Sequence, residues 1–139
     1  MMLALVLVTS PAFAQNTTAA PATTTSTTAT KIACVGTAVA TREAAIGAAV
    51  STHDQAVEAA YTARATELAG AYSNTTTATV KTGAKTAWAD FNKSVKSAAA
   101  TWKASRNAAW TAFRTAAKVC KAPTGVSDAT NASSEVSGQ

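Results

Sequence analysis

Large apolar side chains recur at helical spacing through two long, alanine-rich stretches, residues 32–72 and 79–122. In the first stretch the gaps between them are three, four or seven residues, which is typical of one face of a helix. In the second, the bulky residues from Trp88 to Cys120 fall within a sector about 100° wide. Alanine and threonine occupy 62 of the 139 positions, and alanine is the best helix former. Two helices of roughly 60–65 Å are therefore predicted, at about 1.5 Å per residue.

A single break separates the two stretches. Residues 73–77 read Ser-Asn-Thr-Thr-Thr, where Asn tolerates the left-handed conformation that ends helices and Thr can cap the next helix. In an antiparallel hairpin, facing positions share a constant sum of residue numbers. Cys34 and Cys120 sum to 154, which places the fold point at residue 77, inside the break. The sequence therefore predicts an all-α fold, a long antiparallel two-helix hairpin over residues 31–122, coiled-coil-like and closed by one disulfide.

The two ends of the chain differ from the helical stretches. Residues 1–14 combine an apolar run with the small-x-small pattern Ala12-Phe13-Ala14, which predicts a secretory signal peptide. A buried apolar segment is the alternative, and because no basic residue precedes Lys31 we expect the natural start to lie upstream. Residues 15–30 and 123–139 lack periodic apolar residues, which predicts a disordered spacer and a disordered tail. The expected location is secreted or extracytoplasmic, free or envelope-associated, where a disulfide persists.

Charge is divided unequally between the two predicted helices. The first carries a net charge of −1 and the second a net charge of +8. We expect four ion pairs between the helices in this register: Glu58–Lys96, Glu67–Lys85, Asp54–Lys103 and Glu43–Arg114. Each exposed pair is worth at most about 1 kcal/mol, so these pairs would set the register more than the stability.

The positive charge left on the second helix has three interpretations. It is a solvated face that aids solubility, or it binds anionic polymers of the envelope, such as acidic glycans, lipid headgroups or extracellular DNA. The third, a membrane-active amphipathic helix, is disfavoured because pairing within the hairpin would occupy the apolar stripe. The candidate residues for polymer binding are Lys85, Lys93, Lys96, Lys103, Arg114, Lys118 and Lys121.

Aromatic residues dominate the apolar stripe of the second helix. Such a stripe is more often core than binding site, yet a single hairpin has little surface with which to cover three tryptophans. Apolar surface left over would favour a homodimer, for example a four-helix bundle. The candidate residues for self-association are Trp88, Trp102, Trp110 and Phe113.

No catalytic arrangement is recognisable. His53 is the only histidine and both cysteines are assigned to the disulfide, so the chain offers neither a Ser-His-Asp nor a Cys-His arrangement. The acidic residues of the first helix lack a Glu-x-x-His pair, and the chain has no glycine-rich phosphate loop. We therefore expect no enzyme activity, no metal, no cofactor and no small-molecule substrate.

Three short motifs carry a resemblance. They are the Cys-Val pair after Lys31, Thr-Arg-Glu-Ala-Ala at residues 41–45, and Cys-Lys-Ala-Pro at residues 120–123. With them, residues 31–123 resemble a group of uncharacterised, exported, alanine-rich proteins encoded by genomes of ultrasmall candidate-phyla bacteria. The resemblance implies an extracytoplasmic location and no particular activity. The expected function is that of a secreted or cell-surface structural or interaction protein, the alternative being a cationic binder of anionic envelope polymers.

Overall fold

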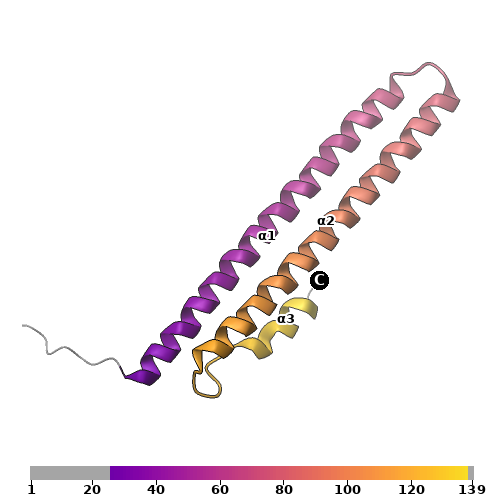
Figure 1. Ribbon diagram of the computed structural model, residues 1–139. Helices are drawn as coiled ribbons and strands as arrows, with labels where there is room; N and C mark the ends of the chain where they lie inside the picture. Colours follow the sequence, from indigo (N-terminus) through magenta and orange to yellow (C-terminus); the bar gives the residue numbers. More distant parts are fainter. Residues whose placement is uncertain (1–25, 138–139) are drawn as a thin grey trace, which may run out of the picture.

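The computed structural model describes residues 26–137, and two long helices that lie side by side make up most of it (Figure 1). Helix α1 spans Thr27–Tyr72 and helix α2 spans Thr77–Cys120. A 3₁₀ helix, η1 (Ala129–Asn131), leads into a short helix, α3 (Ala132–Ser137). No strand occurs in this part of the chain. The predicted all-α hairpin is confirmed, with both helices beginning earlier than expected.

The start of α1 falls inside the region predicted as a disordered spacer. Residues 27–30 already belong to the helix, so that part of the prediction is wrong. Ser26 explains the boundary, because its hydroxyl oxygen accepts a hydrogen bond of 3.1 Å from the amide of Ala29 and so caps the first turn. The predicted signal peptide (residues 1–14) and the rest of the spacer lie outside the described residues.

The break between the helices is a tight turn at residues 73–76. Thr76 caps α2 as predicted, since its hydroxyl accepts a hydrogen bond of 3.4 Å from the amide of Thr79. The end of α1 differs from the prediction, because Asn74 is not left-handed. Instead its side-chain amide donates to the carbonyls of Gly70 and Ala71, at 3.0 and 3.1 Å. These bonds satisfy carbonyls that the helix end leaves free.

The two ends of the hairpin fix its register. At the end opposite the turn, which we call the open end, Cys34 and Cys120 form a disulfide with their Cα atoms 5.7 Å apart. Near the turn, a Cβ atom on Gly83 would stand only 2.8 Å from the Cβ atom of Ala71. Both pairs of residue numbers sum to 154. The register predicted from the cysteines therefore holds along the whole hairpin, and glycine at 83 permits the close approach.

The contact between the helices repeats every 11 residues rather than every seven. One buried series runs along each helix: Ala38, Ala49, Ala60 and Ala71 on α1, and Ala87, Ala98, Ala109 and Cys120 on α2. Eleven residues in three turns is 3.67 residues per turn, close to the natural α-helical value. The seam is thus an alanine seam, unlike the seven-residue repeat of left-handed coiled coils.

The C-terminal segment folds back onto the open end. Lys121 (φ 51°) and Gly125 (φ 85°) take left-handed backbone conformations that reverse the chain after α2. Val126, Ala129 and Ala132 then pack against the buried cluster of α1 and α2. Figure 1 shows α3 alongside the C-terminal part of α2. Over residues 123–137 the predicted disordered tail is therefore replaced by a docked segment.

Helix α1 is long and apolar enough, by length and composition alone, to cross a membrane. An 18-residue window of it has a mean hydropathy of 1.2, and 22% of that window is buried in the hairpin. Its apolar character comes largely from alanine, and four of those alanines (Ala38, Ala49, Ala60 and Ala71) occupy the seam with α2. A helix that forms half of a hairpin core meets the same criterion, so we describe α1 as a hairpin helix.

Candidate functional site

The seven basic residues predicted to bind anionic polymers are all exposed; six of them lie on α2, and Lys121 directly follows its end. We call this set the basic stripe: Lys85, Lys93, Lys96, Lys103, Arg114, Lys118 and Lys121. Lys85, Lys96, Lys103 and Arg114 are separated by 11, 7 and 11 residues, each near a whole number of helical turns. From Lys85 to Lys118 the stripe therefore follows one sector of the helix over roughly 50 Å, at about 1.5 Å per residue.

The four ion pairs predicted between α1 and α2 do not form. Within residues 26–137 the acidic partners lie elsewhere: Glu43 binds Arg42 at 2.6 Å, and Asp54 faces His53 at 3.2 Å. Glu58 and Glu67 are exposed and belong to no ion pair in this part of the chain. An exposed pair gains too little to hold two long side chains in one geometry. The basic stripe consequently keeps its full charge, with no carboxylate within 4.0 Å among the described residues.

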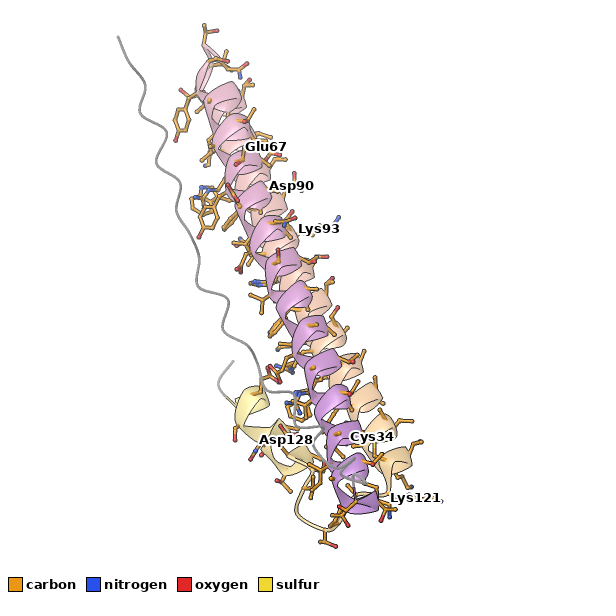
Figure 2. All side chains as sticks on the ribbon, turned by 90° about the vertical axis from the view of Figure 1, so that its left-hand side faces the viewer. Cys34, Glu67, Asp90, Lys93, Lys121 and Asp128 are labelled. Atoms are coloured by element: carbon orange, nitrogen blue, oxygen red, sulfur yellow. A yellow bond between two sulfur atoms is a disulfide. The ribbon has the colours of Figure 1, made fainter. Side chains whose placement is uncertain are left out.

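A cluster near the open end holds the C-terminal segment in place. We call it the covered cluster; it consists of Arg42, Trp110 and Phe113, all of them buried. The Arg42 guanidinium carbon lies 4.1 Å from the Trp110 ring centroid and 4.5 Å from that of Phe113. Its two terminal nitrogens donate to the two oxygens of Asp128, each at 2.8 Å. The indole N–H of Trp110 donates to Glu135 of α3. Figure 2 shows Asp128 at the open end of the hairpin, at about the level of Cys34.

The Arg42–Asp128 pair shifts both groups toward their charged forms. Hydrogen bonding to Asp128 raises the pKa of the Arg42 guanidinium above its usual value, with Glu43 adding to the effect and burial opposing it. The hydrogen bonds from Arg42 lower the pKa of the Asp128 carboxyl, again against the opposing effect of burial. The pair is therefore ionised at neutral pH and fastens the docked segment.

A second arginine–aromatic cluster lies nearer the turn. We call it the open cluster because two of its rings are exposed, and it does not lie at the open end. It consists of Tyr61, Arg64, Trp88 and Phe91. The Arg64 guanidinium carbon lies 4.8, 4.4 and 4.2 Å from the ring centroids of Tyr61, Trp88 and Phe91, respectively. Tyr61 and Phe91 meet edge to face with centroids 4.9 Å apart. Tyr61 is 51% exposed and Trp88 is 48% exposed, so this cluster faces solvent.

The residues predicted to mediate self-association divide between these two environments. Trp102, Trp110 and Phe113 are buried within the hairpin and under its C-terminal segment. Only Trp88 keeps a large exposed ring surface. One chain thus covers most of the aromatic stripe by itself, using residues 126–135 that the sequence interpretation treated as a tail. Self-association stays a prediction, with Trp88 as its remaining exposed candidate.

Arg106 is buried to 3% exposure in α2 without a carboxylate partner among the described residues. Its Nε and Nη2 atoms donate to the side-chain oxygen of Asn107 at 3.4 and 3.2 Å, and its Nη1 atom has no hydrogen-bond partner. The Trp102 ring centroid lies 6.0 Å from its guanidinium carbon. The sequence interpretation counted Arg106 only in the net charge of the second helix and did not predict its burial.

His53 lies on the seam, half-buried, as a boundary residue. It lines a shallow groove of about 810 Å³ between the helices, together with Trp102 and many small side chains. Its Nδ1 atom is 3.2 Å from the Asp54 carboxylate. Residues 26–137 contain no group of three or more His, Cys, Asp or Glu side chains that could hold a metal ion.

The buried arginines and their acidic partners are the residues that sequence reasoning missed. A repeat was the available signal: Arg42 and Arg64 are 22 residues apart, and so are the Trp-x-x-Phe pairs that begin at Trp88 and Trp110. In comparisons with known proteins, no family model, no curated protein and no solved structure matches this chain.

Proposed function

We propose that this chain is a non-catalytic structural or interaction protein of the extracytoplasmic space, and that its partner is an anionic polymer bound along α2. The observation that carries the proposal is the basic stripe, whose seven side chains are exposed and free of carboxylate partners among the described residues. Unpaired charges in a line create a positive potential that attracts a polyanion. Had the four expected ion pairs formed, four of those charges would have been neutralised.

The shape of the stripe favours a polymer over a small anion. Its charges on α2 extend roughly 50 Å along the helix, at about 1.5 Å per residue, so they suit a partner with repeated negative charge. Acidic glycans, lipid headgroup surfaces and extracellular DNA share that property. Helix insertion into a membrane is disfavoured, because Trp102, Trp110 and Phe113 already have buried positions within the chain.

The disulfide supports an extracytoplasmic setting. Cys34 and Cys120 are joined, and no free cysteine occurs among the described residues. Disulfides persist in oxidising compartments and are rare in the cytoplasm. Secretion through a signal peptide at residues 1–14 belongs to the same proposal and would be tested by N-terminal sequencing of the mature protein.

Binding across a salt series tests the proposal. The oxidised full chain would be titrated with sheared duplex DNA and with polygalacturonate at several salt concentrations. For DNA, each phosphate contact contributes about −0.9 to the slope of log affinity against log salt. The combined change Lys96→Ala, Lys103→Ala and Arg114→Ala should therefore make that slope shallower by about 2–3.

A matched control separates position from charge. Lys31 lies on α1, outside the stripe. Lys31→Gln and Lys103→Gln remove the same charge, and only Lys103→Gln should weaken binding appreciably. Equal effects of the two changes would reduce the interaction to net charge. An unchanged affinity in the triple variant, with its helix content intact, would overturn the proposal.

A further inference from the structure

The covered and open clusters are two copies of one arrangement. Arg42 stands over Trp110 and Phe113 at 4.1 and 4.5 Å, and Arg64 stands over Trp88 and Phe91 at 4.4 and 4.2 Å. The arginine, tryptophan and phenylalanine of one cluster each lie 22 residues from their counterparts, which is two of the 11-residue units of the seam; Tyr61 has Val39 at the equivalent position. Both clusters therefore present a guanidinium to the same side of the hairpin, between the same types of ring.

The two clusters differ in what covers them. Arg42 has two carboxylate partners, Glu43 and Asp128, and the Trp110 indole N–H donates to Glu135. Arg64 has no carboxylate within 4.0 Å in residues 26–137, and the place of Glu43 is taken by Ala65.

Trp88 shows the same contrast. Its indole N–H has no hydrogen-bond acceptor among the described residues, although its counterpart Trp110 has one. With Tyr61 and Trp88 about half exposed, the open cluster has the donors of the covered cluster without its acceptors.

We propose that the open cluster is a docking site for an acidic peptide segment of a partner protein, held as residues 126–135 are held at the covered cluster. A carboxylate of the partner accepts two hydrogen bonds from the Arg64 guanidinium, as Asp128 does from Arg42. A second carboxylate accepts the Trp88 indole N–H, as Glu135 does from Trp110. Rings on its faces orient the guanidinium for planar, two-pronged recognition of a carboxylate.

The chain itself is a poor source for this segment. Residues 1–25 contain no Asp or Glu, so they cannot supply the carboxylate. Asp128 and Glu135 are already engaged at the covered cluster of their own chain. A second copy would have to release that contact before its own segment could bind here. The contact within one chain is favoured over release, because a tethered segment has a high effective concentration. The chain carries a net charge of +5, which complements an acidic partner.

Titration with a synthetic peptide tests the proposal. The probe is a peptide of residues 122–137, added to the oxidised, full-length, ¹⁵N-labelled chain, whose covered cluster its own segment already fills. We expect a saturable shift of the Trp88 indole N–H resonance. Because a hydrogen bond to a charged group is worth about 1.5–3 kcal/mol, Arg64→Gln should weaken binding by roughly 10- to 100-fold. Arg64→Lys should restore only part of the affinity, since an ammonium lacks the planar fork.

Controls separate docking from general charge. Lys31→Gln removes the same charge far from the open cluster and should change the affinity by less than about twofold at moderate salt. A peptide with Asp128→Asn and Glu135→Gln should not bind. Each variant is first checked for an unchanged helix content and melting temperature, so that a loss of binding reports the site.

Other outcomes would overturn the proposal. The absence of a saturable Trp88 shift, or equal effects of Arg64→Gln and Lys31→Gln, would eliminate the site. A shift confined to Trp110 would indicate exchange of the C-terminal segment. Sedimentation of the chain alone as an Arg64-dependent dimer would assign the cluster to a second copy, and Arg64-dependent binding of polygalacturonate without the peptide would assign it to a glycan. The proposed polymer binding is independent, because the stripe variant should lose DNA and still bind the peptide.

Discussion

Removal of the disulfide should destabilise this hairpin by a large fraction of the stability that is usual for a small domain. Cys34 and Cys120 are 86 residues apart and join the open end, so the bridge closes almost the entire hairpin into a loop. In the chain-entropy treatment a loop of that length stabilises the folded state by about 4.6 kcal/mol. Small domains are stable by only about 5–15 kcal/mol. The expected loss in the variant Cys34→Ala with Cys120→Ala is therefore about 4–5 kcal/mol.

The loss should begin at the open end. The turn at residues 73–76 still connects the helices locally, and the close contact of Ala71 with Gly83 lies beside it. Without the bridge, the register near Cys34 depends on the Arg42–Asp128 pair and the packed aromatic rings. Those contacts enclose less apolar surface than an ordinary core, because most seam residues are alanines.

Urea unfolding and hydrogen exchange would measure both effects. Helix content by circular dichroism and tryptophan fluorescence should both report a lower urea midpoint, in the double variant and in the reduced wild type alike. Amides of residues 30–50 and 109–120 should lose more protection than those of residues 60–71. An unchanged midpoint in both samples would refute the reasoning, as would an equal loss of protection along the hairpin.

Three further predictions concern single side chains. Arg42→Met should destabilise the chain by about 2 kcal/mol, because it leaves the carboxylate of Asp128 without its partner. Arg106→Met should instead stabilise the chain by about 1 kcal/mol, because it removes a buried donor that has no partner. Thermal melts compare the two variants. The pKa of Asp128 is lowered in the folded state. Its stabilising contribution is therefore present above the unfolded pKa of about 3.9 and is lost as the pH falls through the lower folded value. The tryptophan emission of the wild type should accordingly change in acid, and that of Asp128→Asn should not. Gly83→Ala should destabilise the hairpin, because a Cβ atom there would stand 2.8 Å from the Cβ atom of Ala71. Gly47 has open space around it, so Gly47→Ala should stabilise α1 by about 0.5–1 kcal/mol. Equal effects of the two changes in urea titrations would contradict the close packing at residue 83.

The backbone of this fold was predictable because its determinants are local or symmetric. The cap at Thr76 is predicted by the short polar run at residues 73–77. The register follows from the cysteines and this break, whose positions are independent of one another. The interhelical ion pairs were not predictable from register alone. Register places Glu58 and Lys96 at facing levels, yet both side chains are exposed and water competes for each.

The docked C-terminal segment shows a different limit. Helix α3 has six residues, far too few to be stable alone, so no local pattern identifies it. Its position depends on Asp128 and Glu135 reaching Arg42 and Trp110 from far along the chain. Such a contact is recognisable only after the hairpin has brought the arginine and the rings together.

Arg42 takes the place of a large apolar residue in this hairpin, and carboxylate acceptors accompany its burial, whereas Arg106 is buried without one. The alanine seam brings the helices close, and the guanidinium of Arg42 fills the space beside it, stacked on two rings and 5% exposed. Two carboxylates offset its desolvation. Arg64 stacks on rings just as closely but lacks a carboxylate among the described residues, and it is only partly buried. Whatever covers the open cluster must therefore bring an acceptor for Arg64, because a purely apolar surface would bury that charge without compensation.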